Sequence, residues 1–485
     1  MQQDKTDQTT TSSKTECKEQ ALLFPELIGR SVRVDFAGGY VSSDGGALLL
    51  GRLDRSYGYL QRFSQHFVDY RNQELIEHSV LELLRQRIYG IALGYEDLND
   101  HDQLRQDPLL AAVCGKSDVL GQRRHKRQDE GKGLAGKSTL NRMELTGADA
   151  SRAERYKKIL ALEEAIADYF IQEWVRSLPG ATEQVILDLD ATNDPLHGQQ
   201  EGRFFQGLYQ EYCYLPLYIF CGHWPIVAKL RSSQSQASAG ALEEVQKIFI
   251  ALRKKFPRVR IILRADSGFC RSAIMEWCEQ KKVSYVFGLA RNKVLQRRIK
   301  SAMRQAKALA QQRPEQSARV FVEFDYAAGS WSKQKRRVIA KAQWTEGEPN
   351  PRFIITNLAL SQYRPTALYE ELYCARGEME NRIKEQQLDL FAERTSTHWM
   401  RSNQLRLWFS TLAYLLLNQM RTVALMGTEL AHACCGTIRL RLLKIGAVIK
   451  VSFRRVCVSL SSAFPLTKLF RQLCARLAIL PPAAG

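Results

Sequence analysis

The sequence has no paired cysteines and little histidine. Its 11 cysteines form no Cys-x-x-Cys pair, and its 8 histidines do not join them in a cluster with metal-ligand spacing. A zinc site is therefore not expected, because zinc is held by Cys and His ligands at short, regular spacings. Cys434 and Cys435 are adjacent and cannot easily bridge each other, and an odd number of cysteines indicates reduced thiols in a cytosol.

A long apolar segment is also missing. Residues 1–20 are polar, lack the apolar core of a signal peptide and have almost nothing to bury, so we expect a disordered tail. The most apolar segment, 405–420, contains Arg406, Asn418 and Gln419 and is short for a membrane span. It predicts a buried helix, and no membrane partner is expected.

Acidic residues are in deficit. The 51 Asp and Glu residues face 70 Lys and Arg residues, which leaves a formal net charge of +19. This excess favours a polyanionic partner, because Lys and Arg release condensed counterions when they neutralise phosphates. Between 116 and 138 we expect a basic loop to contact a DNA backbone through Arg123, Arg124, Lys126 and Arg127. A solvated basic loop is the alternative.

The same loop contains a pattern that is typical of nucleotide binding. GKGLAGKS (131–138) matches the P-loop pattern G-x-x-x-x-G-K-[ST] at every defined position. A P-loop follows a buried strand, whose end positions the loop against the phosphates. The preceding residues, GQRRHKRQDE, cannot form such a strand, so we do not expect ATP binding here.

The length of 485 residues is too great for one core and predicts several packed units. After the tail, residues 21–180 are expected to form a mainly helical N-terminal DNA-binding domain. Its clearest helices are predicted at 77–94 and 155–178, where apolar residues recur at three- and four-residue steps.

The periodicity changes to that of strands after residue 180. Runs rich in β-forming residues and two helical segments follow in the order β-β-β-α-β-α-β. Strands are expected at 185–191, 212–220, 225–231, 259–265 and 284–290, and helices at 240–256 and 272–282. This is the order of an RNase H-like core, in which a three-stranded meander precedes αβ units that add parallel strands. The aromatic segment 203–218 is expected to pack in the core of the sheet.

We therefore predict an α/β fold whose RNase H-like catalytic core is interrupted by a β-rich insertion. The first part of the core spans 181–300, the insertion spans 301–360, and a helical part of the core spans 361–425. A basic C-terminal region, 426–485, is expected to add a strand pair and a last helix.

Three acidic residues are the strongest candidates for a catalytic site. Asp190 and Asp266 come at the ends of strand-like runs, and Glu380 lies on a helical segment. Strand ends and a helix face can converge in space, and three carboxylates are what a pair of Mg²⁺ ions needs for phosphodiester chemistry. Taken singly, each has a plain structural explanation: a strand end in solvent, an Asp-Ser-Gly turn and a solvated charged helix.

Neighbouring residues extend this candidate site. Asp188 alternates with Asp190 along the strand, so it is a possible substitute ligand on the same face. Tyr373, Arg376 and Glu380 fall at i, i+3 and i+7, which places them on one helix face. We expect Arg376 to contact a phosphate and Tyr373 to pack against a sugar or base.

Several segments resemble a known family. LDLDATNDPLHGQQEGRFFQGLYQEYCYLPLYIF, RADSGF and YCARGEMENRIKE are similar to segments of DDE transposases of the insertion-sequence 1380 family. That family lies within the larger set of RNase H-like transposases with a β-rich insertion. VDFAGGYVSSDGGALLL (34–50) and GYEDLNDHDQLRQDP (94–108) extend the resemblance over nearly the whole chain.

The resemblance implies DNA cleavage at the terminal inverted repeats of an insertion sequence, followed by transfer of the freed 3′-hydroxyl into target DNA. It assigns catalysis and metal binding to Asp190, Asp266 and Glu380, with two Mg²⁺ ions that Mn²⁺ can replace. Related transposases carry a Tyr-x₂-Arg-x₃-Glu-x₆-Lys signature, but the Lys position is Gln387 here. Lys384, about one turn earlier, is the alternative phosphate contact.

The resemblance also implies a homodimer on DNA, in the bacterial cytoplasm at the nucleoid. Two other functions remain open. One is a metal-dependent nuclease of the same fold that performs no strand transfer. The other is a DNA-binding regulator that has lost catalysis.

Overall fold

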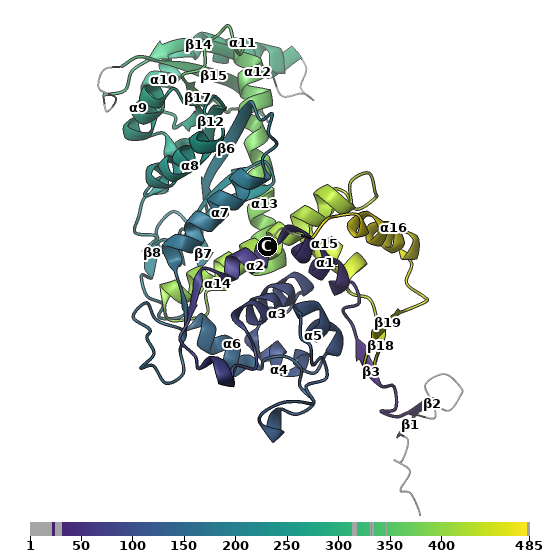
Figure 1. Ribbon diagram of the computed structural model, residues 1–485. Coiled ribbons are helices and arrows are strands. Elements are labelled where there is room, and N and C mark those ends of the chain that lie inside the picture. Colours follow the sequence, from purple (N-terminus) through teal and green to yellow (C-terminus); the bar gives the residue numbers. More distant parts are fainter. Residues whose placement is uncertain are drawn as a thin grey trace, which may run out of the picture.

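The computed structural model describes residues 22–24, 32–312, 318–329, 331, 334–345 and 347–482. It shows a mixed α/β protein in which a part built around a large sheet lies beside a helical part (Figure 1). The predicted disordered tail, 1–20, lies outside the described residues.

The large sheet has the strand order β11-β10-β6-β12-β13-β17-β15-β14, with β16 (Glu348–Pro349) beside β15. Its first five strands in the chain are β6 (Gln184–Ala191), β10 (Leu217–Cys221), β11 (Trp224–Lys229), β12 (Arg260–Ala265) and β13 (Ser284–Leu289). β10 is antiparallel to both β6 and β11, whereas β12 is parallel to both β6 and β13. A meander followed by added parallel strands is the topology that the sequence predicts for these five.

Helices cover both faces of the sheet. α8 (Ala241–Lys255) connects β11 to β12, and α9 (Ser272–Lys281) connects β12 to β13. α7 (Glu163–Ser177) packs against α8 and β11, with Trp174 in the same core as the sheet's Leu187. On the opposite face, Leu368 shares a core with Ile262. Leu368 follows α12 (Pro365–Ala367) in the helical segment that leads to Glu380.

The strands expected in an insertion continue the same sheet. They are β14 (Ala318–Tyr326), β15 (Arg336–Thr345) and β17 (Arg352–Thr356). β17 pairs antiparallel with β13, and β15 lies between β17 and β14. The pairing satisfies the backbone groups of β13, which would otherwise form an open edge. α10 (Lys293–Arg298) and α11 (Lys300–Gln312) precede these strands, and α11 packs against β14 and β15.

The predicted strand 212–220 is divided in the structure. It forms the end of β9 (Glu211–Tyr214) and most of β10, which belong to different sheets. Pro216 lies between them and has no N–H to donate to a ladder, so one continuous strand is disfavoured. β9 pairs instead with β7 (Asp194–Pro195) and β8 (Phe204–Gln206).

The predicted helix 155–178 is wrong in its first third. Ile159–Ala161 forms β5, which pairs with β4 (Phe67–Asp69), and α7 begins only at Glu163. The tertiary pairing with β4 overrides the helical periodicity of this short apolar stretch.

The helical part is built around α14 (Met400–Gln419), which is buried along most of its length and contacts α3 and β11. The prediction of a buried helix at 405–420 is confirmed. Within the described residues, no helix has the length and apolarity that a membrane crossing requires. The helices around α14 are α1 (Ala47–Tyr57), α2 (Tyr59–Ser64), α3 (Val80–Leu93), α4 (His101–Leu104), α5 (Pro108–Cys114) and α6 (Lys137–Glu144).

The C-terminal region joins the N-terminal one. β18 (Ala447–Val451) and β19 (Val456–Leu460) form the predicted strand pair, and β18 also pairs with β3 (Tyr40–Ser42). α15 (Cys435–Ile438) precedes them and α16 (Thr467–Ala478) follows as the predicted last helix. A separate pair, β1 (Leu22–Phe24) and β2 (Val32–Val34), lies further along the chain towards the N-terminus.

Candidate active site

Two candidate acids meet at the ends of adjacent parallel strands. β6 and β12 are paired as far as Leu189 and Ala265, and the next residues are Asp190 and Asp266. One oxygen of Asp266 accepts a hydrogen bond of 2.9 Å from the Gly268 N–H and so caps a short 3₁₀ turn. The turn fixes the direction of the carboxylate. Asp266 therefore caps the Asp-Ser-Gly turn and also lies at the candidate acidic site, so the two interpretations do not exclude each other.

Asp188 lies on the same strand but has different partners. Both of its oxygens are bound by Arg264, which stands directly opposite on β12. Arg264 also donates a 2.5 Å hydrogen bond to the Leu372 carbonyl, so the pair ties the helical segment to the sheet. With only 2% of Asp188 exposed, its position is that of a buried structural ion pair. Asp190, unlike Asp188, does not have both of its oxygens engaged by one arginine.

Glu380 reaches this edge of the sheet from α13 (Gly377–Lys384). The Arg376 guanidinium bridges the two elements, with nitrogen–oxygen distances of 3.2 Å to Asp190 and 2.6 Å to Glu380. The helix before α13 is irregular, with a π-helical stretch over Leu368–Tyr373 and a 3₁₀ turn over Cys374–Arg376. Such local changes of helix type re-aim side chains and recur at functional sites.

Tyr373 approaches the same edge. A Cβ on Gly288 of β13 would lie 2.8 Å from the Tyr373 hydroxyl and 2.8 Å from the Ser267 backbone nitrogen. Only glycine therefore leaves room at this point for both the tyrosine and the turn that carries Asp266. Burial raises the pKa of Tyr373, while the nearby Arg376 guanidinium acts in the opposite direction.

The three acids influence one another electrostatically. Burial and, to a smaller extent, the negative charges of Asp266 and Glu380 raise the pKa of Asp190 to about 6, against the lowering effect of Arg376. Burial lowers the pKa of Arg376, but Asp190 and Glu380 more than offset this, so its pKa is raised overall. Arg376 therefore stays charged between the carboxylates.

The donor set can be tested against a divalent cation. In the part of the chain that the structure describes, no three His, Cys, Asp or Glu side chains are gathered as a ligand shell. Arg376 supplies the positive charge between two of the acids, in the place where a cation is needed. Carboxylate oxygens are the ligands that Mg²⁺ prefers, so the chemistry of Asp190, Asp266 and Glu380 fits this ion.

Gln387, which stands where the signature has a lysine, lies close to a buried acid. The Gln387 amide donates to the Asn193 carbonyl at 3.1 Å and lies 3.5 Å from Asp194. Asp194 is fully buried, and burial raises its pKa to about 7. Gln387 thus holds the loop that follows Asp190. Lys384 is exposed on α13, where its role as a phosphate contact stays a prediction.

The β8–β9 hairpin was missed as part of this site. The segment 203–218 was expected in the sheet core, but Phe204, Phe205, Leu208 and Tyr212 are exposed, and only the residues from Cys213 onward are buried. Tyr209, in the turn, has a pKa that burial raises, with smaller contributions from the negative charges of Asp190 and Asp266. The density of aromatics in a turn-bounded segment was the available signal.

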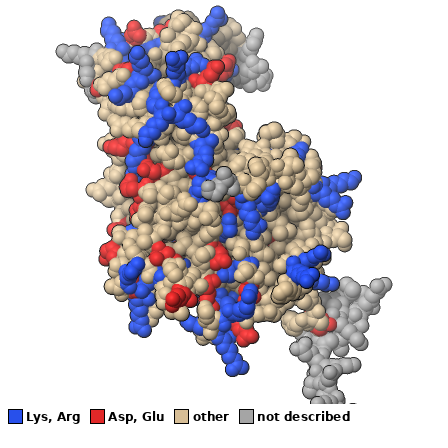
Figure 2. Space-filling view, viewed as in Figure 1, with Lys and Arg blue, Asp and Glu red and all other residues tan. Residues whose placement is uncertain are grey.

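The predicted basic DNA contacts lie in the helical part, in the long connection between α5 and α6. Arg123 and Arg127 are exposed, Lys126 is exposed at the rim of a cleft, and Arg124 lies deeper. Figure 2 shows Lys and Arg side chains over both the sheet part and the helical part of the face in view. DNA binding by these residues stays a prediction.

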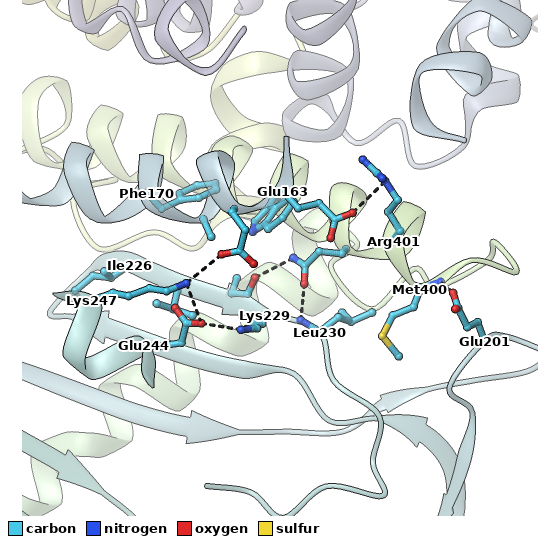
Figure 3. A pocket seen from close by; sticks show the side chains of 16 residues that line it. Glu163, Phe170, Glu201, Ile226, Lys229, Leu230, Glu244, Lys247, Met400 and Arg401 are labelled. Carbon is cyan, nitrogen blue, oxygen red and sulfur yellow. Dashed lines mark hydrogen bonds and ion pairs between the residues drawn. The ribbon is translucent and has the colours of Figure 1, made fainter. Parts of the chain in front are cut away.

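A hollow of about 310 Å³ lies between α7, β11, α8 and α14 (Figure 3). Each of its basic residues is paired with an acid, Lys247 with Glu164, Lys229 with Glu244, and Arg401 with Glu163, and a fourth acid, Glu201, also lines it. The Gln404 amide bonds to the backbone of β11 and covers the edge of the sheet. The hollow therefore lies between the sheet part and the helical part of the molecule, and all three of its basic residues are already paired.

The fold and the acids define an α/β protein with a carboxylate site where the ends of parallel strands meet a helix. The family described as "Transposase DDE domain group 1" matches residues 24–482. The chain belongs to this family, which makes it a DDE transposase in general terms. A comparison with curated proteins finds no match.

Proposed function

We propose that the protein cleaves DNA at the terminal inverted repeats of an insertion sequence and joins the freed 3′-hydroxyl to target DNA. The observation that carries this proposal is the ion pairing of Arg376 with both Asp190 and Glu380, next to the strand end that carries Asp266. The meander-plus-parallel topology supports an RNase H-like core, and the resemblance to the insertion-sequence 1380 family supports the finer assignment.

The three acids are proposed as the ligands of two Mg²⁺ ions, which Mn²⁺ can replace. When bound, such ions activate the attacking oxygen and stabilise the leaving oxygen of a phosphodiester. The protein's contribution is to hold the carboxylates in place: β6 and β12 fix two of them, and the Gly268 amide orients Asp266. Asp188 remains the substitute ligand, but Arg264 occupies both of its oxygens.

Arg376 is proposed to have two successive partners. Without substrate its guanidinium neutralises Asp190 and Glu380. When the scissile phosphate arrives, the guanidinium is available to bind its oxygens, because Arg forms bidentate hydrogen bonds to phosphate. Tyr373 is proposed to contact the adjoining sugar or base, and Lys384 a neighbouring phosphate.

The remaining partners follow from the chemistry. Two transposon ends must be joined to one target, so we propose a homodimer on DNA. We also propose the bacterial cytoplasm, at the nucleoid, as the site of action. The proposed domain division has DNA binding in residues 21–180, a catalytic core in 181–300 and 361–425, added strands in 301–360, and a basic C-terminal region in 426–485.

The test of the function uses a plasmid that carries the inverted repeats bounding the coding region. With Mg²⁺, the purified protein is expected to release 3′-hydroxyl ends and to join them to a second plasmid, as sequencing of the junctions would show. Cleavage without any joined product supports the nuclease. DNA binding with neither product supports the regulator, and both outcomes contradict the proposal.

The pH dependence of cleavage provides a second prediction. Asp190 must lose its proton to bind a metal ion, and its pKa is about 6. Cleavage is therefore expected to fall as the pH drops below this value, by about tenfold per unit. Arg376 lowers the pKa of Asp190, so Arg376→Gln is expected to move the midpoint upward.

Single-turnover cleavage at saturating Mg²⁺, with DNA binding measured at each pH, checks this expectation. A midpoint in Arg376→Gln that stays in place, or moves down, would show that Arg376 and Asp190 are not coupled in solution.

A further inference from the structure

A second candidate site lies in the helical part, away from the carboxylates. It is a cleft of about 770 Å³ formed by five chain segments, which include the ends of β4 and β5, the basic connection before α6, and α6 itself. The lining contains Arg124 and Lys126, whereas Arg123 and Arg127 of the predicted DNA contact are not part of it.

The cleft has an excess of positive charge. Three acids line it, and each already has a basic partner: Glu77 pairs with Arg124, Asp102 with Lys137, and Asp129 with Arg105. A further lining residue, Arg71, pairs with Asp69 outside the lining. Among the described residues, no ion pair engages the four other basic residues of the lining, which are Lys126, Arg142, Arg155 and Lys158. These four charges lack a counterion.

The deepest basic residue has an unused donor. The Arg124 side chain is only 10% exposed, and its Nε is buried without a hydrogen-bond partner. Its other nitrogens reach His78 at 2.6 Å and Glu77 at 3.2 Å. Burial, with the surrounding Lys116, Arg124, Arg71 and Arg105, lowers the pKa of His78 to about 2, so this imidazole is neutral and accepts from Arg124. A buried donor without a partner is unfavourable, and an oxygen ligand that reached Nε would satisfy it.

The arrangement does not suit a nucleoside triphosphate. The P-loop-like segment 131–138 follows a 3₁₀ turn, Arg127–Asp129, and not a buried strand. The amide at the start of α6, that of Lys137, already donates to Asp102 at 3.0 Å. A carboxylate thus lies where a P-loop would bind phosphate. The prediction that this segment is not a nucleotide site stands.

The four unpaired basic residues come from three of the segments that line the cleft. Arg142 and Arg155 lie 4.7 Å and 5.0 Å from the ring centre of Tyr156, which is 52% exposed. Lys158 follows two residues later on the rim, and Lys126 comes from the connection before α6. Separate segments therefore present separate cations, with an aromatic ring between two of them. Several unpaired cations beside an exposed aromatic ring suit the phosphates of a nucleic-acid backbone, with a sugar against the ring.

We propose that this cleft binds consecutive backbone phosphates of DNA and so anchors the duplex at a distance from the carboxylates. The proposal rests on the proposed function, since it takes DNA as the substrate. It makes no claim on base sequence, because phosphate contacts position a duplex without reading it.

The test compares two double variants of the full-length protein. Lys126→Gln/Arg155→Gln removes two cleft charges, and Lys254→Gln/Lys281→Gln removes two exposed charges on α8 and α9. Binding of an inverted-repeat duplex and of a random duplex is measured by fluorescence anisotropy over a series of salt concentrations. All four substituted residues are exposed, so thermal melts are expected to match the parent protein.

The cleft variant is expected to bind both duplexes about tenfold more weakly, and the slope of log affinity against log salt should fall by about 2, since each phosphate contact contributes about 0.9. The control variant should match the parent protein. Equal behaviour of the two variants would overturn the proposal.

Two further arms separate the alternatives. The buried residue is tested by Arg124→Lys, which keeps the charge and removes the Nε donor. This variant should weaken DNA binding without a change in salt slope.

Inorganic phosphate and ATP are added as competitors. Displacement of DNA by ATP at far lower concentration than by phosphate would overturn the proposal in favour of a nucleotide site. If the parent protein binds and cleaves DNA while the cleft variant is unaffected, the cleft assignment fails and the proposed function stands. If the parent protein binds no DNA, both fail.

Discussion

Asp190→Asn is expected to lower the rate of Mg²⁺-dependent DNA cleavage by on the order of 10³-fold. Asp190 lies beside Asp266 at the strand ends and is linked to Glu380 through Arg376. An amide carries no negative charge, so a divalent cation loses one of its carboxylate ligands while the shape of the site is kept. Single-turnover cleavage of an inverted-repeat duplex measures the loss, and anisotropy should show that DNA binding is largely retained.

Asp188→Asn is the matched control, because it changes the same residue type two positions earlier on the same strand. Its main effect is expected on stability. Arg264 is buried and would lose its only carboxylate partner among the described residues, and breaking a buried ion pair costs about 3–5 kcal/mol. A lower melting temperature is therefore expected, while the protein that remains folded should still cleave DNA.

Asp190→Asn is expected to change the stability in a pH-dependent way. The pKa of Asp190 is about 6 in the folded protein, above the ordinary 3.8, so the folded state loses stability as the pH rises through about 6. Asn removes this loss, which is worth roughly 1–3 kcal/mol at neutral pH and little below the ordinary pKa. If folded Asp188→Asn is inactive and Asp190→Asn remains active, the first ligand must be reassigned to Asp188.

The sequence was sufficient to predict the strands that carry Asp190 and Asp266. The apolar runs that end at Asp190 and Asp266 are continuous and bounded by turn residues, and they form β6 and β12 with the predicted pairing. The periodicity of the sequence could not decide between Asp188 and Asp190, because both side chains point to the same face of the strand. It depends on Arg264, whose position opposite Asp188 follows from the register of a partner strand 76 residues away.

The other differences between the sequence predictions and the structure also arise from tertiary contacts. The exposed hairpin of β8 and β9 has the composition of core strands, and only its packing shows that the rings of Phe204 and Phe205 remain outside. The continuation of the large sheet by β17 depends on the pairing of β13 with a strand about 70 residues later in the chain. The basic cleft combines five segments, of which the sequence pointed to only one.

Gly288→Ala is expected to lower cleavage by on the order of 10²-fold, although residue 288 carries no chemistry. An alanine Cβ would lie 2.8 Å from the Ser267 nitrogen and 2.8 Å from the Tyr373 hydroxyl. Relief requires a shift of the turn that orients Asp266, or of the tyrosine next to Arg376 on the helix side. Small-to-large changes in packed regions cost about 1–3 kcal/mol, so the melting temperature should also fall.

The double variant Tyr373→Phe/Gly288→Ala separates the two contacts. Phenylalanine removes the hydroxyl, but the Ser267 backbone remains in the way of the new methyl group. If the tyrosine contact alone disturbs the site, the double variant should recover the rate of Tyr373→Phe. If the turn that carries Asp266 is displaced, recovery should be partial at most, and we expect this second result because a backbone segment cannot rotate away as a side chain can. Gly180→Ala, where no atom lies within 4 Å of the added carbon, is the control and should leave cleavage unchanged. An unchanged rate in Gly288→Ala would mean that the position of Asp266 does not depend on this close approach.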